Sequence, residues 1–357
     1  MTRLIIIADD LTGALDASAP FAMRGLSTVI ALGAETLPEA LASGADIIGV
    51  STDSREIAPE AARCAVAEVV SRLPAELPIF KKIDSRLKGN IAAELDAIPH
   101  TRSLVVPAIP AFGRWVRDGQ LGGFGLDQSI DVAARLGEHA AKAIIPDATS
   151  QQQIAAALRE HDHDLMIGAR GLAEALAEQW SDRLVPAPQL AAGTAVICVI
   201  GSTDPITVEQ AEALRERYPG LAYIGAPNGV AADLVTGRLT LLQATAGVEP
   251  AAPAVVAANL ARVLQGLAPA AGTALVLSGG ATAQAILEAL GIGLITLVGE
   301  ALPGLPIARA GGFTIITKSG VLGTRTRLSA SRRLPVGTNG SDTNSDVRWS
   351  QRKTQPF

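Results

Sequence analysis

The chain has 357 residues, 48% of them hydrophobic, which is enough for a large core and for two domains of ordinary size. Lys and Arg number 30 against 35 Asp and Glu, so the net charge of -5 argues against a broad basic surface for nucleic acid or an anionic membrane. The only cysteines, Cys64 and Cys198, lie far apart in apolar runs, and no apolar run reaches the roughly 20 residues of a membrane helix or forms a leader. We therefore expect a cytoplasmic protein with free thiols and no membrane partner.

A buried strand that ends in two acids opens the chain. Residues 4–8 form a continuous apolar run of the kind found inside parallel sheets. Asp9 and Asp10 follow directly, ahead of a glycine-containing turn and a helix of small residues. This carboxyl edge is where open α/β sheets bind ligands. The two acids either cap the helix or take part in chemistry, and the local pattern leaves both interpretations open.

Further strand-like segments in the first half also end in polar residues. They are residues 27–32, 45–50, 79–80 and 103–106. Arg55 follows the second of these, and Arg114 and Asp118 follow the last. The segments alternate with helical periodicity, which predicts a doubly wound α/β fold. Independent helix capping does not readily explain so many polar strand ends.

The most polar stretch is Lys-Lys-Ile-Asp-Ser-Arg-Leu-Lys-Gly-Asn at residues 81–90. It lies between a strand-like run and a helix-like run at 91–95. A helix start stabilises anions through unpaired N–H groups and the helix dipole. The alternative is a solvated charge cluster that caps an amphipathic helix. The polar ends of the other strands favour a binding loop.

A second α/β half is predicted to begin after a Pro/Ala/Gly-rich boundary at 184–193. Its first buried strand, 195–200, ends in Gly201-Ser202, and a later strand ends in Ser278 to Thr282. Adjacent glycines let the backbone approach a ligand closely. The spacing matches neither a Walker A loop nor a dinucleotide fingerprint, so each turn is a weak signal alone. We predict domains at 1–188 and 194–328, followed by a disordered tail at 329–357.

His161 and His163 alternate with Asp162 and Asp164, a pattern that could bind a metal. No further ligand cluster accompanies them, so a solvated turn is the better interpretation. We predict no metal site formed by the protein alone.

Taken together and in order, these stretches resemble the four-carbon acid sugar kinase family. The matching motifs are residues 7–14, 82–90, 107–114 with Asp118-Gly119, 201–202, 279–283 and 318–323. The resemblance implies a sugar-acid domain followed by an ATP domain, each with a mostly parallel sheet, and an active site in the cleft between them. It also implies phosphorylation of the terminal hydroxyl of threonate, erythronate, a 3-oxo-tetronate or a related branched oxo-acid.

The predicted site follows from the resemblance and from the chemistry of a sugar acid. Its carboxylate needs cations, and its hydroxyls need polar partners. The residues predicted to bind the sugar acid are Asp9, Asp10, Arg55, Lys82, Ile83, Asp84, Ser85, Arg86, Asn90 and Arg114. Those that the resemblance implies for ATP are Ser202, Gly279, Gly280, Ala281, Thr282, Gly320 and Gly323.

Phosphoryl transfer to an alcohol also needs one acceptor for the hydroxyl proton. We predict Asp10 for this catalytic role, with Asp9, Asp84 and Asp118 as alternatives. Mg²⁺ is expected from the reaction class, bridging the ATP phosphates without an all-protein cage. The expected partners are the sugar acid and ATP, with homo-oligomer formation left open.

Two other functions are compatible with parts of this pattern. Val321 and Leu322 depart from the last motif of the family, which prompts the alternative of a non-catalytic sugar-acid sensor with a degenerate nucleotide site. Such a sensor would bind the acid but not ATP. A two-domain dehydrogenase is disfavoured because no dinucleotide fingerprint is present.

Overall fold

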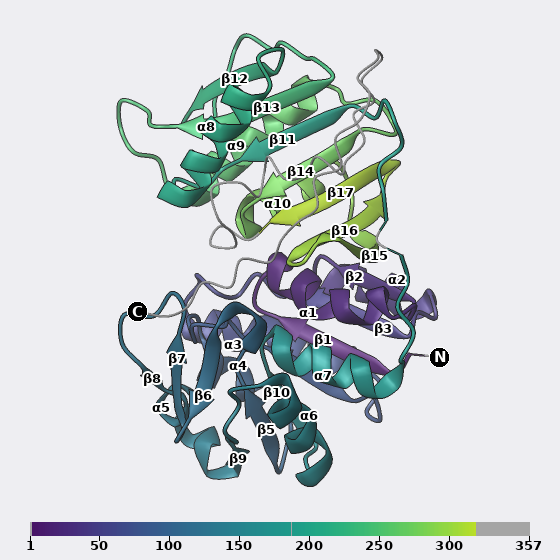
Figure 1. Cartoon of the computed structure of the whole chain (residues 1–357), viewed down its shortest axis with the longest axis vertical. Helices are drawn as coiled ribbons and strands as arrows, with labels where there is room; N and C mark the ends of the chain where they lie inside the picture. The colour runs from purple at the N-terminus through teal and green to yellow at the C-terminus, as the bar shows by residue number, and fades with distance from the viewer. Residues whose placement is uncertain (1, 187, 319–357) are drawn as a thin grey trace, which may run out of the picture.

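The computed structural model describes residues 2–186 and 188–318, and one 14-stranded sheet runs through them in the order β12-β13-β11-β14-β17-β16-β15-β2-β3-β1-β4-β10-β5-β9 (Figure 1). Its strands are β1 (Leu4–Ala8), β2 (Thr28–Ala31), β3 (Ile47–Ser51), β4 (Ile79–Lys82), β5 (Ser103–Val106), β9 (Ala143–Ile144), β10 (Leu165–Gly168), β11 (Val196–Ile200), β12 (Ala222–Pro227), β13 (Leu239–Thr245), β14 (Ala274–Ser278), β15 (Leu294–Leu302), β16 (Leu305–Ala310) and β17 (Phe313–Lys318). The α-helices are α1 (Leu11–Met23), α2 (Leu37–Ala42), α3 (Pro59–Ser71), α4 (Ile91–Leu95), α5 (Val132–Leu136), α6 (Gln151–Glu160), α7 (Arg170–Trp180), α8 (Pro205–Arg217), α9 (Pro253–Gly266) and α10 (Gly280–Ala289). The predicted α/β class with a mostly parallel sheet is confirmed.

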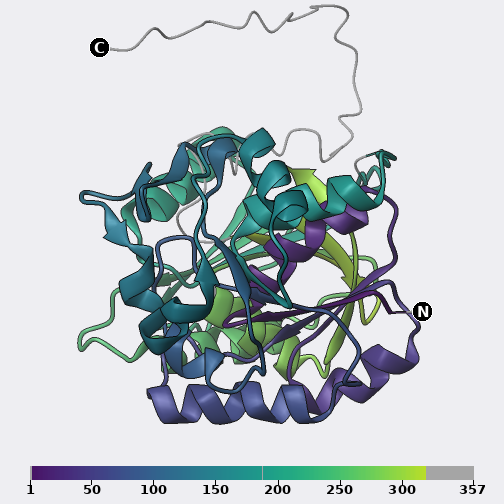
Figure 2. The same ribbon diagram turned by 90° about the horizontal axis from the view of Figure 1, so that it is seen from below.

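In the first half, β1 lies between β3 and β4, and these three strands run parallel. The apolar run 4–8 explains this central place, because its side chains are fully buried. Helices α1, α7 and α6 cover one face of the sheet, while α3 and α4 lie on the other (Figures 1 and 2). The carboxyl ends of β1, β3 and β4 therefore meet where the strand order reverses, which is the usual ligand position in such sheets.

The second half repeats this arrangement around β11, which lies between β13 and β14. Helices α9 and α10 pack side by side, and α8 contributes Ala211 and Leu214 to a separate hydrophobic cluster. The turn after β11 and the turn after β14 thus lie next to each other at the carboxyl edge. These are the turns at 201–202 and 279–282 that were predicted to bind ATP.

The two halves join through an antiparallel pair, β15 with β2, in which Leu294 is opposite Ala31. Helix α1 also packs on β15, β16 and α10 of the second half, and it lies at the junction in Figure 1. One hydrophobic cluster combines Leu11 and Leu15 of α1 with Ile286 and Ile295 of the second half. The two sheets are therefore continuous, which local sequence patterns do not predict.

Several elements differ from the local predictions. Strand β4 extends to Lys82, so Lys81 and Lys82 belong to a buried strand and not to the solvated charge cluster considered as an alternative. A small sheet of β6 (Arg114–Arg117), β7 (Gln120–Gly123) and β8 (Ile130–Asp131) was not predicted. Gly320, Gly323 and the predicted tail 329–357 lie outside the described residues. Within the described ranges, none of the helices has the length and apolar character needed to cross a bilayer.

Candidate active site

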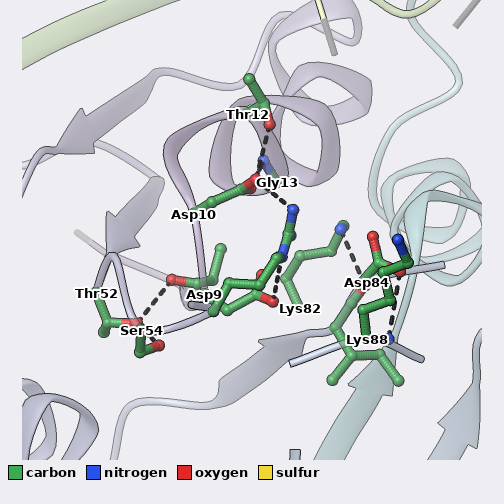
Figure 3. A network of polar contacts seen from close by, with 12 residues as sticks. Asp9, Asp10, Thr12, Gly13, Thr52, Ser54, Lys82, Asp84 and Lys88 are labelled. Carbon is green, nitrogen blue, oxygen red and sulfur yellow. Dashed lines mark hydrogen bonds and ion pairs between the residues drawn. The ribbon is translucent and has the colours of Figure 1, made fainter. Parts of the chain in front are cut away.

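Asp9 and Asp10 share one guanidinium at the carboxyl end of β1. Arg55, on the loop after β3, donates to both oxygens of Asp9 at 2.8 Å and to Asp10 Oδ2 at 2.5 Å. Asp10 is also the N-cap of α1, since its Oδ1 accepts from the Gly13 N–H at 2.5 Å (Figure 3). The capping interpretation is therefore confirmed for Asp10. Its Oδ2 also accepts from Thr12 Oγ1, so the same carboxylate serves a cap and a polar cluster.

The two adjacent acids have opposite pKa shifts. Burial raises the pKa of Asp9, but the hydrogen bond and charge of Arg55 outweigh it, so the pKa of Asp9 lies below its ordinary value. Burial holds the pKa of Asp10 above its ordinary value, an effect that Arg55 opposes and the charge of Asp9 reinforces. Neighbouring carboxylates whose pKa values are pushed apart are typical of an acid or base paired with a permanent charge.

Two lysines at the end of β4 lie near this cluster. Lys82 is buried, donates from Nζ to the Ile83 carbonyl at 2.9 Å, and lowers the pKa of both acids through its charge. Lys81 is fully buried and forms a 2.8 Å ion pair with Glu94 of α4. Ser54 donates to the same Glu94 carboxylate, which ties the Arg55 loop to β4 and α4.

The polar turn after β4 is ordered mainly by its own groups. Asp84 accepts at Oδ1 from the backbone N–H groups of Arg86 and Lys88, at 2.8 and 3.4 Å (Figure 3). Asn90 donates to the carbonyls of Ser54 at 2.9 Å and Ile57 at 2.8 Å, so it holds the Arg55 loop in place. These contacts give Asp84 and Asn90 structural roles next to the cluster.

Arg114 is a buried guanidinium with no carboxylate partner among the described residues. It is 7% exposed, donates to Ser85 Oγ at 2.5 Å and to the Phe124 carbonyl at 2.8 Å, and forms no ion pair with the described residues. Its Nε is buried and has no hydrogen-bond partner in the part of the chain that the structure describes. Burial lowers the pKa of Arg114, and Asp84 only partly offsets this. A buried cation in this state is suited to an anionic ligand.

The glycine turn of the second half reaches the first-half cluster. A Cβ atom added to Gly280 would lie 3.1 Å from Asp10 Oδ2 and 3.4 Å from Thr12 Oγ1. Gly279 has a φ of 102° and precedes α10, so both α1 and α10 start beside Asp10. A helix N-terminus with adjacent glycines is an established kind of phosphate site.

The other predicted nucleotide residues flank this turn. Thr282 is buried and packs against Gly201, where an added Cβ would lie 2.1 Å from the Thr282 hydroxyl. Ser202 accepts the Asp204 N–H at 3.2 Å, and Ala281 is exposed at the start of α10. The structure thus brings the residues that were predicted to bind ATP, as far as it describes them, together at one edge of the sheet.

Other predicted residues have less direct placements. The Ile83 side chain is buried in the first-half core and only its carbonyl contacts Lys82. Asp118 lies in the exposed turn between β6 and β7, where its N–H donates to Asp147. This contact with Asp147 does not connect Asp118 with the Asp10 cluster.

Sequence reasoning missed several polar groups around the site. The Ser278 hydroxyl, at the end of β14, is buried and has no hydrogen-bond partner among the described residues. Asp53 lies on the Arg55 loop, and burial together with the charges of Glu288 and Asp10 raises its pKa. The polar strand end at 51–55 was a signal for Asp53, but Glu288 lies in the last turn of α10 and no sequence pattern pointed to it. The described residues contain no cluster of His, Cys, Asp and Glu able to hold a metal on its own.

The site and fold define a class of two-part α/β protein, with buried cations and acids at the carboxyl edge of the first half and a glycine turn at a helix start in the second. Comparison with known families agrees with this class. Residues 4–129 match a sugar-binding N-terminal domain, and residues 228–328 match a nucleotide-binding C-terminal domain.

Curated relatives identify the family more closely. The chain is 30% identical to a D-threonate kinase of Cupriavidus necator, over 91% of this chain and 96% of that protein. It is 28% identical to a 3-oxo-tetronate kinase of Methylobacterium radiotolerans, over 89% and 95%. A D-erythronate kinase of Heliobacterium modesticaldum is 38% identical over 34% of this chain and 29% of its own length. The chain belongs to the four-carbon acid sugar kinase family.

Solved structures show the same fold. A Salmonella typhimurium protein described as a tRNA synthase matches with a TM-score of 0.71 at 19% identity, over 93% of this chain and 99% of that one. A Haemophilus influenzae protein from a domain family of unknown function matches with a TM-score of 0.65 at 21% identity, over 93% and 100%. At these identities the likeness concerns the fold alone.

Proposed function

We propose that the protein is an ATP-dependent kinase that phosphorylates the terminal hydroxyl of a four-carbon sugar acid. The acid is threonate, erythronate or a 3-oxo-tetronate, or a related branched oxo-acid. The observation that supports this most strongly is the approach of Gly280 to Asp10, because it places a phosphate-type turn beside a carboxylate of the first half. Phosphoryl transfer needs donor and acceptor sites in such proximity.

In this proposal the first half, residues 1–188, binds the sugar acid. Arg114 receives the carboxylate of the acid, because its buried guanidinium lacks an anion while Arg55 is already engaged by Asp9 and Asp10. The other candidate contacts to the acid are Lys82, Ile83, Asp84, Ser85, Arg86 and Asn90. Arg55 then acts mainly by holding the two acids in place.

The second half, residues 194–328, binds ATP. The proposed contacts are Ser202, Gly279, Gly280, Ala281 and Thr282, together with Gly320 and Gly323 beyond the described residues. The first N–H groups of α10 have no partner within the helix, so they are available to phosphate oxygens. The strand order supports the location, since β11 and β14 flank the point where the order reverses.

Asp10 is the proposed proton acceptor. The terminal hydroxyl oxygen attacks the γ-phosphorus, its proton passes to Asp10 Oδ2, and the bond from phosphorus to the ADP oxygen breaks. The raised pKa of Asp10 supports this choice over Asp9, whose pKa lies below its ordinary value. The N-terminus of α10 stabilises the charge on the transferred phosphoryl group.

Mg²⁺ is proposed to enter with the phosphates of ATP, where it would neutralise their charge. Asp53 fits as a protein ligand, because repulsion from Glu288 and Asp10 adds to the effect of burial in raising its pKa. A cation would relieve that repulsion. We also propose the cytoplasm as the place of action, consistent with a phosphate donor that is abundant there.

The test is ADP release with Mg²⁺ and ATP across a panel of threonates, erythronates, 3-oxo-tetronates and branched oxo-acids. One strongly favoured acid is the expected result. Silence across the panel together with a failure to bind ATP in calorimetry would instead support the sugar-acid sensor. Silence with intact ATP binding would mean that the acceptor is an acid outside the panel.

A further inference from the structure

A buried cluster of charges links the two halves. Arg170, the first residue of α7, is 4% exposed. Its guanidinium contacts three carboxylates: Asp16 of α1 at 3.1 Å, Glu174 of α7 at 2.6 Å and Glu300 of β15, reached by both Nη atoms. Asp16 and Glu174 belong to the first half and Glu300 to the second.

The contact with Glu300 is geometrically specific. Both terminal nitrogens of Arg170 donate to the two oxygens of this carboxylate, and such a fork restrains distance and angle together. Glu300 Oε1 also accepts the Gly304 N–H at 3.1 Å, which fixes the carboxylate to the turn between β15 and β16. The Glu300 side chain is 2% exposed, so solvent does little to screen the pair.

Asp16 connects Arg170 with the helix that begins at the candidate active site. It lies on α1, the helix whose N-cap is Asp10, and α1 packs on both α7 and β15. Arg170 therefore connects the helix that presents Asp10 with the strand that joins the second half to the sheet. Because Gly280 already touches the Asp10 region, a small shift of α1 against the second half would change the separation of the two sites.

We infer that Arg170 is a positioning residue that sets the placement of Asp10 relative to the Gly279-Gly280 turn through its fork to Glu300. The inference rests on the proposed kinase function for its kinetic part only. Displacements of about 1 Å in such a site cost on the order of 100-fold in rate. Arg170 would act on kcat, since it touches neither the proposed sugar-acid groups nor the nucleotide turn.

The decisive variant is Glu300→Gln, which keeps the side-chain volume and removes only the charge that crosses the halves. Its matched control is Glu174→Gln, which weakens an Arg170 contact of the same kind within α7. Arg170→Met is a second variant that removes all three contacts. We expect Glu300→Gln to lower kcat by about tenfold or more, with the KM values for acid and ATP within about threefold. Glu174→Gln should stay close to the parent protein.

A distance measurement tests the placement without using activity. Cys64 on α3 is exposed and Cys198 is buried, so a nitroxide label can be placed on Cys64 and on an added cysteine in Val255→Cys, at an exposed site of α9. Electron-electron resonance should give one narrow distance distribution in the parent and in Glu174→Gln, and a shifted or broadened one in Glu300→Gln and Arg170→Met. Unchanged distances in Glu300→Gln, or a kcat within about twofold of the parent, would overturn the inference. If the parent phosphorylates no acid, the proposed function fails while the distances still decide the placement.

Discussion

Gly280 at the start of α10 lies against Asp10 at the start of α1, with 3.1 Å between a Cβ added to Gly280 and Asp10 Oδ2. The residues come from opposite halves, and each is the first or capping residue of its helix. Two helix N-termini therefore converge on one carboxylate, which favours binding of anions there. A nucleotide phosphate on α10 would in this way come close to a group that accepts a proton.

Replacement of Gly280 by alanine tests this approach directly. The helical backbone of Gly280 accepts alanine, but the new methyl group would press on Asp10 and Thr12. We expect kcat to fall by about tenfold or more while thermal stability stays near that of the parent. Gly220→Ala, where the added Cβ meets nothing within 4 Å, is the control and should leave turnover unchanged. Equal turnover in both variants would argue against the close approach.

Asp10→Asn removes the proposed proton acceptor and keeps the side-chain shape. The amide oxygen can still accept from Gly13, so the cap of α1 can persist. We expect kcat to fall by about 100- to 10,000-fold with little change in the affinity for the acid, as measured by steady-state kinetics and calorimetry. An unaffected kcat would remove Asp10 from this role.

The pH dependence of turnover follows from the raised pKa of Asp10. A carboxylate must be ionised to accept a proton, so kcat/KM should fall on acidification. Because the pKa of Asp10 is raised, this fall should begin at a higher pH than for an ordinary Asp, whose pKa is about 3.9. The pKa of Asp9 is lowered, so Asp9 should remain ionised through that window. The measurement is a pH-rate profile of the parent and of Asp10→Asn. An identical acidic limb in both would assign the limb to another group.

Arg114→Met removes the buried guanidinium and keeps an apolar side chain of similar length. If Arg114 binds the carboxylate of the acid, affinity for the acid should weaken by about 10- to 100-fold and affinity for ATP should not change. Arg117→Met is the matched control, because Arg117 lies on the same strand with an exposed side chain over Trp115. A loss of affinity for both ligands would point instead to a general disturbance of the fold.

Glu94→Ala should lower the free energy of unfolding, because it leaves the fully buried Lys81 without its counter-charge. Removing one partner of a buried pair costs about 3 to 5 kcal/mol, although water admitted to the site reduces this. Glu68→Ala breaks an exposed ion pair with Arg72 and should have little effect. Urea unfolding of both variants measures the difference, and equal stabilities would contradict the structural role of Glu94.

Much of the site follows from local patterns in the sequence. The apolar run 4–8 followed by Asp9 and Asp10 indicates a buried parallel strand with acids at its carboxyl edge, and the structure has this arrangement. The turn at 279–280 is also evident from its two glycines and the strand before it. A buried strand is recognised by its run of apolar side chains, and a tight turn by the backbone conformations that glycine allows. Both are local properties of a few neighbouring residues.

Only the tertiary structure decided how these pieces face one another. Arg55 binds Asp9 and Asp10, which precede it by 46 and 45 residues in the chain. This contact contributes to the opposite pKa shifts of Asp9 and Asp10. The pairing of β15 with β2 and the Arg170 fork to Glu300 bring together residues from opposite halves. Burial, desolvation and ion pairing depend on partners distant in the chain, so periodicity and local motifs carry no signal for them.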